Sequence, residues 1–108
     1  MSKKAIPDEV KKEVEEIVER FNRTVLKNPH YYYVARYKGR FLYLDRFDRG
    51  RIRQTCRLEY TGKISEWNFA IFKYSDMGYD PDEWMFPGSG HVDGTIEGAM
   101  RAGMEAYP

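Results

Sequence analysis

The sequence predicts an α+β fold in the order α-β-β-β-β-α, with a four-stranded antiparallel meander and both helices packed on one face. Two observations predict this order. Near the start of the chain, apolar residues recur every three or four positions, which is the spacing of a helix with one buried side. Between residues 31 and 74, runs rich in aromatic and β-branched residues are separated by short turns that contain glycine, as in successive hairpins.

The size and composition of the chain indicate one domain that spans residues 1–108. The formal net charge is +1, so the protein has no overall field that would attract nucleic acid or an anionic membrane. Cys56 is the sole cysteine, which excludes an intramolecular disulfide and agrees with a reducing compartment. The sequence contains no apolar run of membrane-spanning length. We therefore expect a cytoplasmic protein that does not associate with membranes.

The first helix is expected to begin at Pro7, which suits a first helical position. It is expected to stop at Asn28-Pro29, because proline disfavours helix at the residue that precedes it. One apolar stripe predicts one packing partner, most simply the sheet. The stripe consists of Val10, Val14, Ile17, Val18, Phe21 and Val25.

The four strands are expected at residues 31–37, 40–46, 51–61 and 64–74. In the last hairpin, the alternation of side chains places Cys56 and Leu58 on the same face as Trp67 and Phe69. The first hairpin allows two registers, and the preferred one needs a bulge near residues 48–50. The preferred register buries Tyr33, Ala35, Leu42 and Leu44, whereas the other buries Val34, Phe41 and Tyr43.

Residues 75–93 are expected to form a long connection, of a length that is often functional or mobile. Its aromatic segment, Trp84 to Phe86, is expected to hold it against the body of the protein. The last helix is expected at about residues 95–106, capped by Asp93 or Thr95. Two glycines inside it, Gly98 and Gly103, indicate close contact with the sheet or the first helix, because glycine otherwise weakens a helix.

The first candidate site is the outer sheet face, turned away from the helices. Arginines mixed with aromatic rings on an open sheet can stack against a partner's rings or against bases. The leading interpretation is a non-catalytic module that associates with another protein chain, including a second copy of itself. Single-stranded nucleic acid is the second interpretation, and the near-zero net charge weakens it. The residues expected on this face are Tyr32, Arg36, Phe41, Tyr43, Arg51, Arg53, Arg57 and Phe72.

A third interpretation is a small-ligand binder or enzyme built on the 75–93 loop, with His91 and Asp93 as the residues to test. The glycine-rich segment 88–94 precedes a helix, where backbone N–H groups can bind an anion. It matches neither the dinucleotide-binding fingerprint nor the Walker loop. A flexible entry to a capped helix is therefore favoured over a binding loop.

No residue cluster predicts a metal, a cofactor or a catalytic nucleophile. Cys56 lies on the apolar face of its strand, which favours a small buried hydrophobe over a reactive thiol. The acidic residues of the long connection lack the ligand spacing of a calcium loop, and His91 alone is too few nitrogen ligands for zinc. The non-catalytic interpretation is therefore favoured over an enzyme. The acidic residues are Asp76, Asp80, Asp82 and Glu83.

Overall fold

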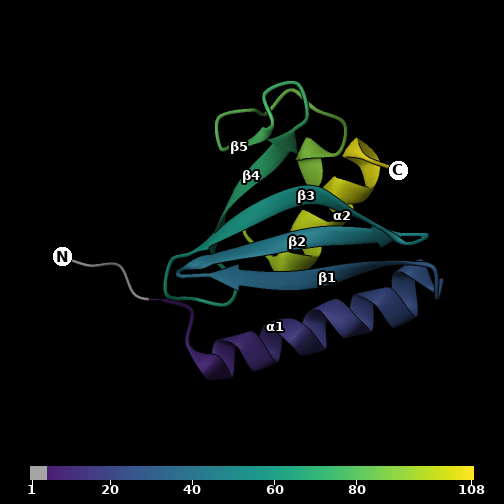
Figure 1. Cartoon of the computed structure of the whole chain (residues 1–108). Helices are drawn as coiled ribbons and strands as arrows, with labels where there is room; N and C mark the ends of the chain where they lie inside the picture. Colours follow the sequence, from purple (N-terminus) through teal and green to yellow (C-terminus); the bar gives the residue numbers. More distant parts are fainter. Residues whose placement is uncertain (1–4) are drawn as a thin grey trace.

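The computed structural model describes residues 5–108, so the first four residues of the expected domain lie outside the described part of the chain. The α+β class is confirmed, and both helices pack on one face of an antiparallel meander in the order β1-β2-β3-β4-β5 (Figure 1). The sheet has five strands, one more than expected. Its elements are α1 (Asp8–Phe21), η1 (Asn22–Leu26), β1 (Tyr31–Lys38), β2 (Phe41–Asp48), β3 (Arg51–Tyr60), β4 (Trp67–Lys73), β5 (Gly78–Asp80), η2 (Ser89–His91) and α2 (Ile96–Ala106).

The additional strand, β5, lies inside the segment that the sequence analysis treats as a long connection. It pairs with the end of β4, with Phe72 opposite Tyr79. A strand of three residues is too short for an alternating pattern, so periodicity gives no signal for it. The turn before it contains Met77 in the left-handed region, with φ 49°. The connection that remains, from Pro81 to Gly88, is correspondingly shorter.

The first helix is shorter than the apolar stripe indicates. The α-helical pattern ends at Phe21 and continues as a π-helical turn, in which the Lys27 N–H bonds the Asn22 carbonyl at 2.9 Å. A π-helical turn contains more residues than an α-helical turn, so the residue that faces the core after this turn is one position later in the sequence than a regular α-helix would place it. Val25 is consequently 41% exposed, which corrects its expected burial, and Leu26 packs against the core in its place.

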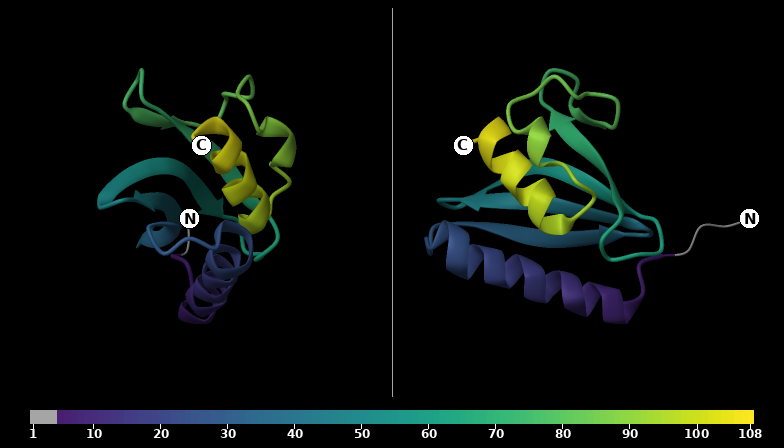
Figure 2. Two further views of the ribbon diagram at one scale, coloured as in Figure 1. Left: turned by 90° about the vertical axis from the view of Figure 1, so that its right-hand side faces the viewer. Right: turned by 180° about the vertical axis from the view of Figure 1, so that it is seen from behind.

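Both helices lie on the same side of the sheet (Figure 2). Tyr33 of β1 joins them, because its ring packs edge-on against Phe21 of α1 and its hydroxyl donates to the Met100 carbonyl of α2 at 2.7 Å. The preferred register of the first hairpin is confirmed, since Tyr33, Leu42 and Leu44 are buried in this core. The expected face-sharing in the last hairpin is also confirmed, with Leu58 opposite Phe69.

The bulge lies elsewhere than expected. The β2–β3 register shifts between Leu44 and Asp45, where Leu44 lies opposite Cys56 but Asp45 lies opposite Gln54. Thr55 is therefore the extra residue, and the turn at residues 48–50 needs none. Because side chains alternate along a strand, the extra residue reverses the face of every β3 side chain that precedes it.

The last helix matches its expected position. Its cap is Thr95, whose hydroxyl oxygen accepts a bond from the Gly98 N–H at 3.0 Å. Gly103 lies against the sheet, as its position inside the helix indicates: a methyl group there would be 2.5 Å from the Tyr33 hydroxyl oxygen. Within the connection before this helix, Phe86 alone of the aromatic segment packs inward, stacked on Phe69. No helix in residues 5–108 is long and apolar enough to cross a membrane.

Candidate functional site

The outer sheet face, the side away from α1 and α2, carries six of the eight residues expected there. Directly opposed residues share a face, and one row runs Arg36–Tyr43–Arg57 across the first three strands. The next row on this face is Val34–Asp45–Gln54, and the row after it is Tyr32–Phe47–Ile52. The six are Tyr32, Arg36, Phe41, Tyr43, Arg57 and Phe72.

Arg51 and Arg53 lie on the opposite face, which corrects their expected position. Arg53 is directly opposite Arg46, and the guanidinium of Arg46 is buried under α2, where it donates to the Gly103 carbonyl. Arg51 is opposite Asp48, two residues further along the same side. The cause is the extra residue at Thr55, because the expected bulge at residues 48–50 would have left β3 in a single alternation.

The polar centre of the outer face is an ion pair between Arg36 and Asp45. The Arg36 Nε is 2.9 Å from one carboxylate oxygen, and a second guanidinium nitrogen is 3.4 Å from the other. The hydrogen bond to Asp45 raises the pKa of Arg36, so the guanidinium stays charged. The Asp45 carboxylate is almost fully buried, and its partner is therefore needed to offset the cost of desolvation.

Aromatic rings and guanidinium groups are layered around this ion pair. The Arg36 guanidinium lies 4.3 Å from the centre of the Tyr43 ring, and Arg57 lies 4.5 Å from the centre of the Phe41 ring. Tyr79 of β5 closes the layer, with its ring 5.3 Å from that of Tyr43. Each such contact contributes about 0.5–1 kcal/mol when exposed. The sequence analysis missed Tyr79 because it missed β5.

The outer face also exposes aliphatic side chains. Val34 is 37% exposed and Ile52 is 58% exposed. Ile52 lies on this face because the bulge at Thr55 reverses the alternation of the β3 residues that precede it. Phe72 is on this face but buried, because the rings of Tyr74 and Tyr79 cover it. The accessible part of the face is therefore a mixture of aliphatic, aromatic and guanidinium groups.

The edge of the sheet at β1 is protected. The Asn22 side-chain amide bonds both backbone groups of Tyr33: its nitrogen donates to the Tyr33 carbonyl at 2.9 Å, and its oxygen accepts from the Tyr33 N–H at 2.8 Å. These are the bonds that an added strand would make, so Asn22 opposes edge-to-edge pairing at this position. Pairing of an added strand with β1 is therefore disfavoured at Tyr33.

The two residues of the expected loop site have different roles. Asp93 accepts hydrogen bonds from the Thr95 N–H and hydroxyl, at 3.0 and 2.6 Å, and these bonds lower the pKa of its carboxyl. It therefore belongs to the helix cap. His91 lies 2.8 Å from the Glu105 carboxylate and lines an open groove of about 270 Å³ between η1 and α2. The side chains of the two residues that sequence reasoning grouped therefore have different partners and do not form one site.

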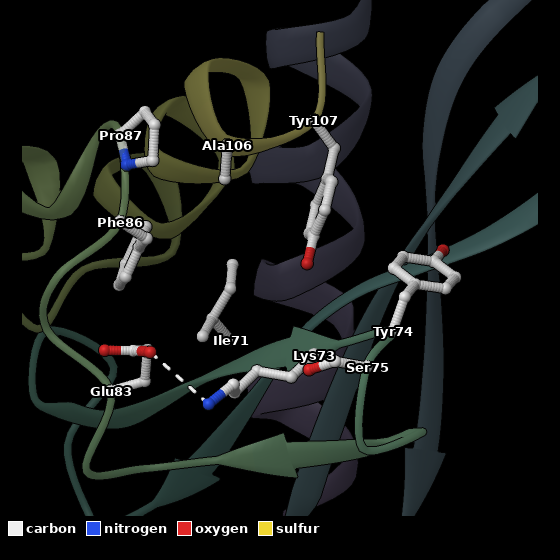
Figure 3. Close-up of a pocket in the computed structure, with 9 residues that line it drawn as sticks. All are labelled: Ile71, Lys73, Tyr74, Ser75, Glu83, Phe86, Pro87, Ala106 and Tyr107. Atoms are coloured by element: carbon white, nitrogen blue, oxygen red, sulfur yellow. Dashed lines mark ion pairs between the residues drawn. The ribbon is translucent and has the colours of Figure 1, made fainter.

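A second pocket, of about 330 Å³, lies between β4, residues 83–87 and the end of α2 (Figure 3). Lys73 projects into it, and its ammonium is within 3.4–3.7 Å of carboxylates from Asp76, Asp80 and Glu83. The lysine thus occupies the centre of the acidic cluster that the sequence analysis considered as a metal site. Within residues 5–108, no group of three or more histidine, cysteine or carboxylate side chains is arranged to hold a metal.

Cys56 is fully buried in the core, and burial raises the pKa of its thiol. A protonated thiol without solvent access does not act as a nucleophile.

Comparisons of this chain with protein-family models, with curated proteins and with solved structures found no match. The function must therefore be argued from the geometry described above.

Proposed function

We propose that this protein is a non-catalytic assembly module in which the outer sheet faces of two copies pack against each other. The observation that carries the proposal is the placement of both helices on one side of the sheet, which leaves the arginine–aromatic face uncovered by residues 5–108. An uncovered sheet face with exposed aliphatic residues is typical of an interaction surface.

The size of the face agrees with a small specific interface. Strands of about eight residues span roughly 26 Å, and the strands are about 4.8 Å apart. The outer face therefore measures roughly 500 Å², and two copies would bury about 1,000 Å² in total, near the lower limit for a specific complex. Such an interface would be of modest affinity and would depend on protein concentration.

A second copy is a suitable partner because the outer face carries both the cations and the aromatic rings that form cation–π contacts. Guanidinium groups and aromatic rings both lie on it, so a two-fold axis can place Arg57 of one copy against rings of the other. The net charge of +1 gives little repulsion between copies. Nucleic acid would instead need free ring faces, and guanidinium groups already lie over Phe41 and Tyr43.

The proposal is tested by the mass of the protein in solution, measured by light scattering over a range of concentrations. We expect the mass to rise towards twice the 12.8 kDa of one chain. The double variant Val34→Glu/Ile52→Glu should remain at 12.8 kDa, because it places two carboxylates in the interface. Both side chains are already exposed, so the fold should tolerate the change.

Val25→Glu is the matched control. Val25 is also an exposed aliphatic residue, but it lies on η1, away from the sheet. This variant should associate as the wild type does. A wild-type mass of one chain at the highest soluble concentration would overturn the proposal, as would equal loss of association in the control.

A further inference from the structure

The end of the β2–β3 hairpin carries three arginines whose positive charge the described residues neutralise only in part. Arg46 and Arg53 are directly opposite each other on adjacent strands, and like charges in this position repel. Arg51 follows on the same side, and no ion pair of Arg51 is found among the described residues. The single carboxylate nearby, Asp48, approaches Arg53 to only 3.8 Å.

Arg46 is the most unusual of these residues because it is completely buried. One of its terminal nitrogens donates to the Gly103 carbonyl at 3.2 Å, and the rings of Tyr31 and Tyr33 lie over the guanidinium. Its Nε and its other terminal nitrogen have no hydrogen-bond partner within residues 5–108. A buried guanidinium without a carboxylate leaves uncompensated positive charge, so an anion nearby would be stabilised.

A pocket of about 530 Å³ opens beside this charge. β4 pairs with β3 only between Cys56 and Tyr60, so residues 51–54 have no strand partner on that side in the described chain. The Tyr74 hydroxyl bonds the Gln54 carbonyl at 2.8 Å and forms one wall. The lining residues are Asp48, Arg51, Ile52, Arg53, Gln54 and Tyr74.

We infer that this pocket binds a phosphate monoester, held by the guanidinium groups of Arg51 and Arg53. Guanidinium forks match the oxygens of a phosphate and form charge-assisted hydrogen bonds with them. Tyr74 provides an apolar wall for the group that carries the phosphate. The volume lies in the range of small-molecule sites. Arg51 and Arg53 point to the helix-covered side of the sheet, whereas Ile52 and Gln54 point to the outer face, so the pocket lies around the edge of β3 that β4 leaves unpaired. The inference does not rest on the proposed assembly, because the two arginines that carry it lie outside the proposed interface.

The test is a titration of ¹⁵N-labelled protein at constant ionic strength, followed by NMR signals of the arginine Nε–H groups. The ligands are inorganic phosphate, adenosine monophosphate and adenosine. We expect saturable shifts of Arg51 and Arg53 with both phosphates and none with adenosine. Tighter binding of the nucleotide would identify a monoester as the ligand, whereas equal binding would identify free phosphate.

Arg51→Gln and Arg53→Gln should each weaken binding by about tenfold or more, the usual effect of losing a charge-assisted hydrogen bond. Arg49→Gln is the matched control, because it removes the same charge from the hairpin turn without lining the pocket. Equal weakening in the control, or shifts that do not saturate, would show diffuse attraction and overturn the inference.

Thermal unfolding provides a readout that distinguishes a binding role from a structural one. Without phosphate, Arg53→Gln should be at least as stable as the wild type, because it removes the repulsion with Arg46. With phosphate, the melting temperature of the wild type should rise, and that of Arg53→Gln should rise less at the same phosphate concentration. An equal rise in the two proteins would contradict the inference.

Discussion

Asp45 and Arg46 are consecutive residues of β2, and their side chains therefore point to opposite faces of the sheet. Asp45 faces outward and is paired with Arg36, whereas Arg46 faces the helices and has no carboxylate partner among the described residues. Both are buried, and a buried charge is stable only when hydrogen bonds or opposite charges offset its desolvation. These two residues thus give each face of the sheet its own polar centre.

At Gly103, even a substitution by alanine is expected to lower the free energy of unfolding. A methyl group at this position would lie 2.5 Å from the Tyr33 hydroxyl oxygen and 2.6 Å from the Thr55 side chain. Gly103→Ala should therefore lower the free energy of unfolding by about 1–2 kcal/mol, because overpacking outweighs the gain in helix propensity. Urea unfolding measures this change.

Gly90→Ala is the control for this substitution, since nothing lies within 4 Å of the methyl group that it adds. It should change the stability by less than about 0.5 kcal/mol. If Gly103→Ala were as stable as the wild type, the close approach of α2 to the sheet would be incorrect.

At the scale of the elements, long periodic segments could be predicted from the sequence and local irregularities could not. The register of the first hairpin follows from Tyr33, Leu42 and Leu44, because only one face of the sheet has a core to fill. The bulge at Thr55 leaves no such signal in the sequence, because most of the residues before and after it are polar or charged. Such residues do not show which face of the strand is buried, so the sequence gives no sign that the alternation reverses there. The misplacement of Arg51 and that of Arg53 both follow from that one residue.

The cap of α2 is an element whose contribution can be measured. The Thr95 hydroxyl accepts a bond from the Gly98 N–H and donates one to Asp93. Thr95→Ala should destabilise the protein by about 1 kcal/mol, as loss of an N-cap does. It should also raise the pKa of Asp93 towards its ordinary value of 3.8, because the hydroxyl bond is the main cause of its depression.

NMR titration of the Asp93 carboxyl checks the second effect. A depressed carboxyl pKa stabilises the fold above pH 3.8, and this contribution disappears as the pH falls through the folded-state pKa. Thr95→Ala should therefore lose less stability on acidification than the wild type. Thr24→Ala is the control, since the Thr24 hydroxyl bonds only a carbonyl within its own helix. An unchanged Asp93 pKa in Thr95→Ala would contradict the assigned cap.

At the scale of the whole molecule, the buried thiol and phenol of the core should make the free energy of unfolding decrease steeply as the pH rises above 9. Burial raises the pKa values of Cys56 and Tyr33 well above their ordinary values of 9.0 and 10.0. Between those values and the folded-state pKa values, only the unfolded chain loses these protons. The free energy of unfolding should therefore decrease by about 1.4 kcal/mol per pH unit for each group that has passed its ordinary pKa.

Urea unfolding from pH 7 to pH 11 measures this slope. Cys56→Ala should be less stable at pH 7, because it leaves a cavity, but its decline between pH 9 and pH 10 should be shallower. A wild-type stability that stays constant across this range would show that the thiol and the phenol are not buried as described.

The whole-molecule arrangement, with two helices on one side of a five-stranded sheet, leads to the central claim that two copies associate through their outer faces. Spectra of a mixture of ¹³C-labelled and unlabelled protein, filtered for contacts between the two kinds of chain, test this claim most directly. Nuclear Overhauser effects from the Ile52 methyl groups of one copy to the Phe47 or Tyr43 rings of another would support it. Intermolecular contacts confined to α1, α2 or the 81–88 loop would contradict it, as would the absence of any intermolecular contact at the highest soluble concentration.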